Sequence, residues 1–166
     1  MPLDQVIGAL DQLHRLHLDL LEREREKKEK IIRNDLEALN AVSEQEAELI
    51  EQIAEAEQQR AAAVRAFLRA KGLHSRTNVT VSDLVKMVFR AEERQALTEA
   101  RDRLTETLGE LKRLNALNQQ LLQQSLTMLE YSMDLIAGAP EEEGIYRHPV
   151  KQPAAPKRQR LYDLKA

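Results

Sequence analysis

The sequence predicts an all-α fold: an elongated antiparallel bundle or coiled coil of three long helices plus one short helix, with a disordered C-terminal tail. Between Leu3 and Ala137 the 166-residue chain contains no proline and only three glycines, whereas folds with sheets need frequent Pro and Gly at their turns. There are five aromatic residues and no Trp, so the core is expected to be a narrow aliphatic seam between helices.

The first long helix is predicted from about residue 3 to 33. Apolar residues recur there every three or four positions, which is typical of a helix with one buried face: Leu3, Val6, Leu10, Leu13, Leu16, Leu20, Leu21, Ile31 and Ile32. Every residue from Glu22 to Lys30 is charged. This run is interpreted as a solvated stretch of helix with little core beneath it.

The second long helix is predicted from 43 to 71. Asn34 and Asp35 interrupt the apolar pattern, and the following LEAL is interpreted as a short turn. Ser43 and Glu46 have the spacing of a capping box, which marks a helix start. Lys71 followed by Gly72 is typical of a helix end.

A loop is expected at 73–82, then a short helix at 83–89 capped by Ser82, then a last long helix at 91–137 that ends at Gly138 and Pro140. The residues beyond are Pro-rich and basic, which favours disorder. The chain therefore divides into a helical domain, 1–138, and a flexible tail, 139–166.

The unequal lengths of the helices predict an overhang. The first two helices, of about 30 residues each, span ~45 Å, and the last, of about 47, spans ~70 Å. Short connections make the first two antiparallel and bring the last back parallel to the first. Its final 12 to 16 residues should then project past the hairpin turn.

The predicted overhang is strongly apolar. No charged residue occurs from Leu114 to Leu129, and the apolar positions from Leu121 to Ile136 cover roughly 220° of the helix, about twice the stripe of a helix with one buried face. The two apolar faces predict two neighbours. The second neighbour is either the short helix, a second copy of the chain, or an amphipathic helix of another protein.

Several function classes have little support. Without cysteine there is no disulfide or thiolate chemistry, and no phosphate loop or nucleophile motif occurs. His14 and His17, with Asp11 nearby, are a weak metal candidate. We therefore expect neither an enzyme nor a bound metal or cofactor. The chain start lacks a signal pattern and no apolar run would cross a bilayer, so a cytoplasmic protein without membrane insertion is expected.

Nucleic-acid binding would depend on the tail alone, where six basic residues face one acidic residue from Ile145 onward. Without a structured basic face or stacking aromatics beside it, this alternative is not favoured.

The segment LNALNQQLLQQSLTMLEYSMDLI, Leu114 to Ile136, resembles the signature of FlgN-type flagellar export chaperones, in which an Asn-x-x-Asn-x-x-Leu-Leu pattern opens the substrate-binding end of the last helix. The NDLEAL turn, the SDLVKMV helix and Ile145-Tyr146 support the resemblance. The residues assigned to substrate binding are Asn115, Asn118, Leu121, Leu122, Ser125, Leu126, Met128, Leu129, Met133 and Ile136.

The resemblance implies a cytoplasmic chaperone that binds the C-terminal helices of the hook-filament junction proteins FlgK and FlgL, prevents their premature assembly and delivers them to the export gate. It also implies a contact between a tail tyrosine and the gate protein FlhA, with the export ATPase complex as a further partner. Tyr146 is the best positional match, although the Gly that often follows is missing here, and Tyr162 is the alternative. A coiled-coil scaffold or oligomerisation module without chaperone activity is the competing hypothesis.

Overall fold

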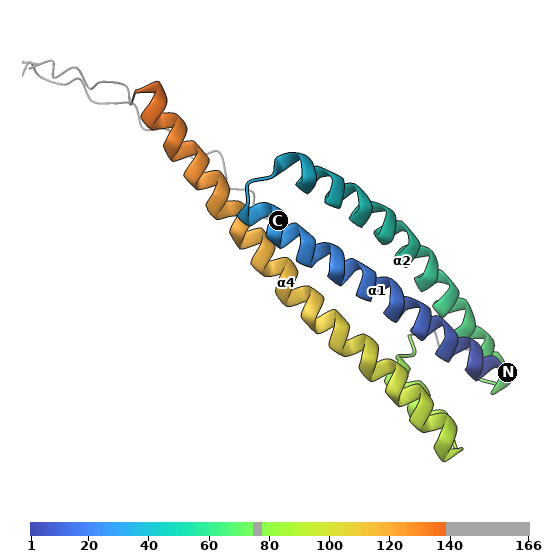
Figure 1. Cartoon of the computed structure of the whole chain (residues 1–166). Helices are drawn as coiled ribbons and strands as arrows, with labels where there is room; N and C mark the ends of the chain where they lie inside the picture. The colour runs from blue at the N-terminus through green and yellow to red at the C-terminus, as the bar shows by residue number, and fades with distance from the viewer. Residues whose placement is uncertain (75–77, 139–166) are drawn as a thin grey trace, which may run out of the picture.

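The computed structural model describes residues 1–74 and 78–138 and confirms the all-α fold, with no strand in these ranges. Three long helices, α1 (Pro2–Ile32), α2 (Leu36–Ala70) and α4 (Ala91–Ala137), accompany the short α3 (Val81–Met87) (Figure 1). The predicted tail, 139–166, lies outside the described residues, so its disorder and its separation from a domain at 1–138 stay predictions.

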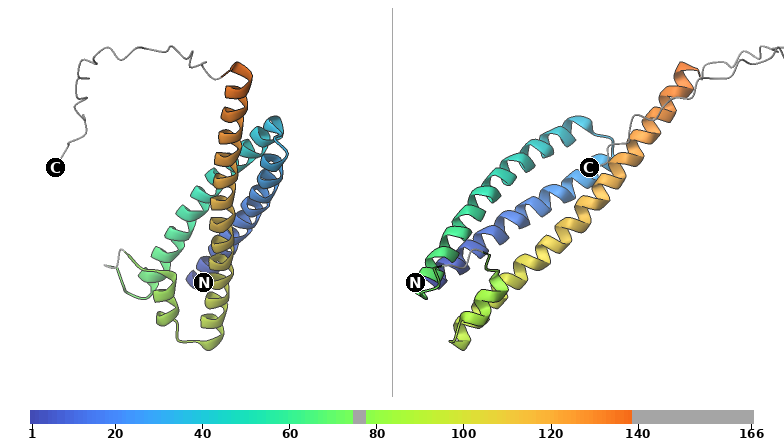
Figure 2. Two further views of the ribbon diagram at one scale, coloured as in Figure 1. Left: turned by 90° about the vertical axis from the view of Figure 1, so that its left-hand side faces the viewer. Right: turned by 180° about the vertical axis from the view of Figure 1, so that it is seen from behind.

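The central helix of the molecule is α1. Its backbone runs close to those of both α2 and α4, whereas the backbones of α2 and α4 do not approach each other closely within the described residues. α2 runs antiparallel to α1 and α4 runs parallel to it, so the bundle is elongated (Figures 1 and 2). Each outer helix is therefore held mainly by the face of α1 that it covers.

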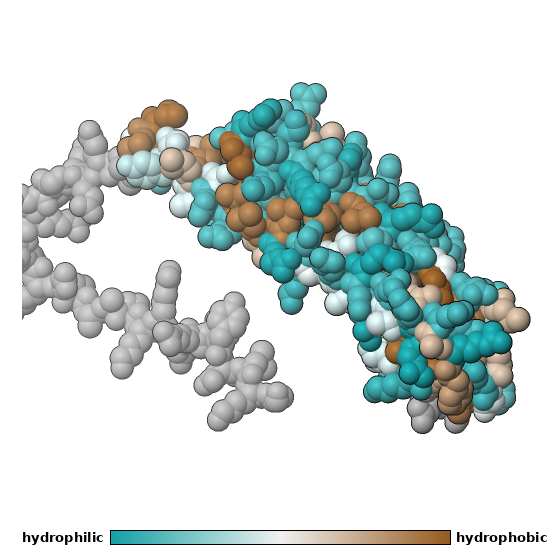
Figure 3. Space-filling view, turned by 60° about the horizontal axis from the view of Figure 1, so that its bottom comes forward, coloured by the Kyte–Doolittle hydropathy of each residue, from teal (hydrophilic) through white to brown (hydrophobic). Residues whose placement is uncertain are grey.

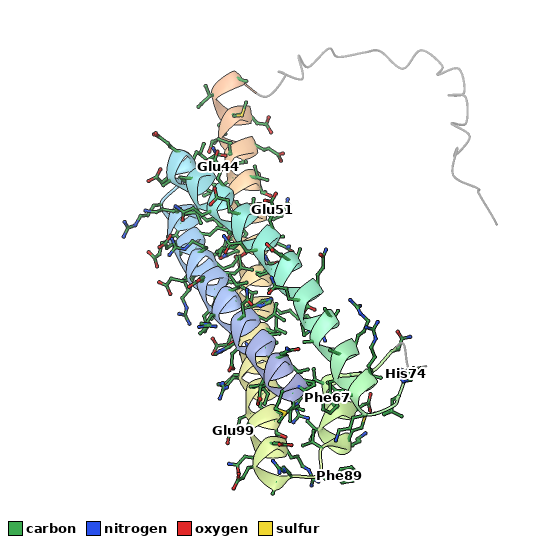
Figure 4. All side chains as sticks on the ribbon, turned by 90° about the vertical axis from the view of Figure 1, so that its right-hand side faces the viewer. Glu44, Glu51, Phe67, His74, Phe89 and Glu99 are labelled. Carbon is green, nitrogen blue, oxygen red and sulfur yellow. The ribbon has the colours of Figure 1, made fainter. Side chains whose placement is uncertain are left out.

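The apolar core is concentrated at one end of the molecule, where all four helices meet. Its buried members are Leu3, Val6, Leu10, Ala63, Val64, Phe67, Leu68, Leu84, Val88, Leu97 and Ala100. Phe67 and Phe89 lie at this end, away from the far end of α4 (Figure 4). The Lys71 ammonium lies 5.7 Å from the centroid of each of these two rings, within the range of a cation–π interaction.

The predicted start of the second helix at Ser43 is wrong. α2 begins at Leu36, and the Asp35 carboxylate caps it by accepting a hydrogen bond of 3.1 Å from the Ala38 N–H. Ser43 lies inside the helix, where its hydroxyl donates to the Leu39 carbonyl. Asp35 follows Asn34, which has a positive φ of 53°, so the turn is tight and LEAL forms the first turn of α2.

The short helix also begins earlier than predicted. Thr80, not Ser82, is the N-cap, and it forms a reciprocal capping box with Asp83. The hydroxyl and backbone N–H of Thr80 both donate to the Asp83 carboxylate, which lowers its pKa. The helix ends at Met87, so Phe89 falls outside it and is exposed.

The predicted overhang is present. The C-terminal end of α4 extends beyond the turn that joins α1 to α2 (Figures 1 and 2), and every residue from Leu126 to Gly138 is exposed. Gly138, with a φ of 70°, ends the helix. No helix in the described part of the chain has an apolar stretch that would span a bilayer.

Candidate protein-binding site

The projecting end of α4 exposes a series of large apolar side chains. They are Leu126, Met128, Leu129, Tyr131, Met133, Leu135 and Ile136, each at least half exposed. Apolar surface gathers at this end of the molecule and continues as a band along the body (Figure 3). The short helix α3 packs against the start of α4, at the opposite end, so it does not cover this surface.

A groove of about 620 Å³ lies where the projecting end of α4 passes the α1–α2 turn. We call it the tip groove. On one side it is lined by Lys30, Ile31, Ile32, Asn34, Leu36 and Leu39, and on the α4 side by Leu121, Leu122, Gln124, Ser125, Leu126, Met128, Leu129 and Ser132. Among the described residues that line it, Lys30 alone is charged, so the groove suits an apolar partner.

The structure separates the ten residues assigned to substrate binding into three groups. Six line the tip groove: Leu121, Leu122, Ser125, Leu126, Met128 and Leu129. Met133 and Ile136 lie further along the exposed end of α4, beyond the groove. Asn115 and Asn118 face α1. Their expected place on the surface of the overhang is corrected, since Asn118 is 1% exposed. Tyr146 lies outside the described residues.

The sequence did not identify the other wall of the groove. Ile32 and Leu36 are exposed at the hairpin turn and line the groove with Leu39. The sequence pattern that indicates this wall is a pair of isoleucines at the end of one helix and a leucine directly after the turn. The interpretation of LEAL as a loop misses the wall, because the start of α2 directs Leu36 and Leu39 towards α4.

A buried polar layer connects the three long helices next to the groove. The Asn118 amide Nδ2 donates to the Glu24 backbone oxygen at 2.9 Å and to its carboxylate Oε2 at 2.7 Å. Asn115 Nδ2 donates to Glu24 Oε1 at 3.1 Å. Lys27 Nζ lies 3.8 Å from Glu24 Oε1 and 2.9 Å from Glu46 Oε2 on α2. The charged run 22–30 is therefore not simply solvated, because Glu24 within it is 4% exposed.

Glu46 is the member of this layer whose negative charge is least well compensated. Burial raises the pKa of its carboxyl above the ordinary 4.5; the hydrogen bond from Lys27 opposes the rise, and the nearby Glu24 carboxylate adds to it. Its Oε1 has no partner among the described residues. Keeping Glu46 ionised thus costs free energy that Lys27 only partly offsets.

We expect Glu46→Gln to change how stability depends on pH. A carboxyl whose pKa rises on folding stabilises the fold below pH ~4.5, and that contribution is lost as the pH rises through the folded-state pKa. The variant has no such loss, so its free energy of unfolding relative to the wild type should increase from pH 4 to pH 7. The introduced amide still presents an oxygen that accepts from Lys27. Urea unfolding across this pH range measures the difference, and a flat or falling difference would contradict the assignment.

The weak metal candidate is engaged in other contacts. Asp11 pairs with Arg103 at 2.9 Å, His14 Nε2 lies 3.1 Å from the Thr107 hydroxyl, and His17 Nδ1 lies 2.7 Å from the Leu13 carbonyl oxygen. No group of three or more His, Asp or Glu among residues 1–74 and 78–138 could hold a metal ion. The contacts of Asp11 and His14 hold α4 on α1.

Together these features define a helical protein with an apolar groove suited to a partner helix. The chain belongs to the FlgN protein family, whose model matches residues 1–153. Membership of this family supports a general role for the chain as a flagellar export chaperone. The chain is 27% identical over 163 residues to the "Uncharacterized protein YvyG" of Bacillus subtilis (strain 168), and the alignment covers 97% of each chain. No solved structure matches the chain significantly.

Proposed function

We propose that the chain is a cytoplasmic export chaperone that holds the C-terminal helices of the junction proteins FlgK and FlgL in the tip groove. The observation that carries this proposal is the groove itself: an apolar surface with walls from three helices, continued by an exposed end of α4. Such a surface on a small protein is typical of an interaction site. Holding the partner helix there prevents premature assembly and needs no catalytic group.

The dimensions of the groove support a helical ligand. Its α4 wall runs from Leu121 to Ser132, about three helical turns or ~17 Å. An amphipathic helix lying along it presents anchors at i, i+3 or i+4, and i+7. Met128 adds an unbranched side chain that adapts to different partners. FlgK and FlgL helices of different sequence therefore fit the same site.

Delivery to the export gate is assigned to residues 139–166. These begin directly after the projecting end of α4, so a contact of Tyr146 or Tyr162 with FlhA is made by the segment that follows the cargo-binding end in the chain. The export ATPase complex is a further partner in this proposal. Nucleic acid and membrane insertion have no part in it.

The experiment is a titration of the purified chain with a peptide of the FlgK or FlgL C-terminal helix, followed by calorimetry and light scattering. We expect a complex of about one peptide per chain, because the tip groove offers one apolar surface for a helix. We also expect the free chain to be monomeric, because a two-fold dimer through the same surface would cover the groove. A stable homodimer at micromolar concentration that excludes the peptide would instead favour the scaffold hypothesis, in which the same apolar surface binds a second copy.

A further inference from the structure

The distal part of α4 is held on α1 by unusual contacts. From residue 101 to 137, the only buried α4 side chains are Thr107 and Asn118, and both are polar. Towards the other end, Leu97 and Ala100 belong to the core shared by all four helices. The part of α4 that leads to the tip groove therefore has no deeply buried apolar side chain of its own.

Asn118 and Glu24 occupy positions in seven-residue series that are otherwise apolar, apart from His17 on α1. On α4, a seven-residue spacing connects Leu97, Leu104, Leu111 and Asn118, and on α1 the same spacing connects Leu3, Leu10, His17, Glu24 and Ile31. These series correspond to the seam positions of a coiled coil. A single Asn at such a position specifies register and partner at a cost in stability.

Asn118 makes hydrogen bonds, which depend on direction, whereas the neighbouring leucines make apolar contacts, which do not. The leucines of α4 do not fall on one narrow stripe: at ~100° per residue, Leu114 and Leu121 lie ~80° and ~100° round the helix from Leu104. More than one rotation of the helix therefore buries a similar apolar area. The two hydrogen bonds from Asn118 Nδ2 to the backbone and carboxylate of Glu24 form in one arrangement. Lys27 extends this restraint to Glu46 on α2.

We propose that Asn118 and Glu24 are a positioning pair: they fix the direction in which the distal half of α4 leaves α1, and so set the shape of the tip groove. The pair stands directly before Leu121 and Leu122 on α4 and one heptad before Ile31 on α1, which are lining residues of the groove. The consequence for ligand binding rests on the proposed function, whereas the direction of α4 does not.

This role makes a prediction that a purely stabilising role does not. Replacing a buried polar pair by apolar side chains of similar volume is often neutral or stabilising. The double variant Glu24→Leu with Asn118→Leu should therefore unfold at the same temperature as the wild type or higher. Its α4 end should nevertheless lose its single direction.

The chain contains no cysteine, so Glu37→Cys and Asp134→Cys introduce two spin labels without competition. Both sites are exposed and neither lines the groove. The distance distribution between the labels should be narrow in the otherwise unchanged chain and clearly wider in the double variant. Affinity for the FlgK or FlgL peptide should fall about tenfold, which corresponds to ~1.4 kcal/mol.

Two variants serve as controls. Glu24→Gln keeps an oxygen that accepts from Asn118 and should keep the narrow distribution. His14→Leu with Thr107→Val removes another α1–α4 polar pair and should also leave the distribution narrow, since Thr107 lies closer to the shared core.

Three results would overturn the positioning role. The first is a distance distribution that stays narrow in the Glu24 and Asn118 double variant, and the second is a wider distribution together with a lower unfolding temperature in that variant. The third is a distribution in the His14 and Thr107 control that widens as much as in the double variant. Unchanged peptide affinity despite a wider distribution would overturn the effect on the groove. If the wild type itself binds no peptide, the proposed function is wrong. The distance distributions between the two spin labels still test the positioning role in that case.

Discussion

Leu122→Asp combined with Leu129→Asp should abolish binding of the FlgK or FlgL helix while the chain stays helical. Both leucines line the tip groove. Burying a leucine side chain contributes about 1.5–3 kcal/mol, and each new carboxylate would have to lose water against an apolar partner. The combined loss exceeds a hundredfold in affinity, or about 2.7 kcal/mol. Helicity should persist, because Leu129 is 55% exposed and Leu122 is only partly covered in the free chain.

A matched control for this experiment lies on the opposite face of the same turns. Gln123→Asp with Thr127→Asp adds the same two charges to exposed positions outside the groove. This control should bind the peptide as the wild type does. Calorimetry measures the affinities, and circular dichroism at 222 nm checks the helices. Retained binding by the Leu122 and Leu129 variant, or an equal loss in the control, would contradict the placement of the ligand in the groove.

The α4 wall of the groove could be predicted from the sequence because its signal is local. An uncharged helical segment with apolar residues on two faces identifies surface that the same chain does not cover, and helix lengths place it beyond the hairpin. The structure bears this out at Leu126 and Leu129, which remain exposed past the turn. Neither inference required knowledge of which helices touch.

The opposite wall depended on where α2 begins, and there two capping signals competed. Ser43 with Glu46 matches a capping box, and Asp35 alone is also a good N-cap. The tight turn at Asn34 brings Asp35 into place, and Lys27 on α1 engages Glu46 at 2.9 Å. The sequence around Ser43 does not contain that tertiary contact, so the local pattern was misleading.

The two asparagines show a different limit. The sequence motif groups Asn115 and Asn118 with the leucines that follow them. Which of these side chains face α1 depends on how α4 packs, and a polar residue at a seam position is conspicuous only once its partner Glu24 is known. One short motif therefore contains both Asn118, the α4 member of the proposed positioning pair, and two leucines that line the groove.

Deleting residues 139–166 should leave peptide binding intact and stop export of FlgK and FlgL. The described residues that line the groove all precede Gly138, so the truncated chain retains each of them. The deleted residues contain the two candidate gate-contacting tyrosines, Tyr146 and Tyr162. Since this segment and the groove belong to one chain, cargo binding and a gate contact are linked, and linkage raises the effective concentration of the cargo at the gate even when the gate contact is weak.

The measurement is the amount of FlgK and FlgL secreted by cells that carry the truncated chain in place of the full-length one, alongside peptide affinity of the purified protein. Tyr146→Ala and Tyr162→Ala, each in the full-length chain, then assign the contact, and we expect the loss of export to follow Tyr146. Export that persists in the truncated chain would remove the gate contact from this segment. If residues 1–138 form the complete binding site, the deletion cannot weaken peptide binding. A collapse of peptide affinity would therefore show that residues 139–166 form part of the site.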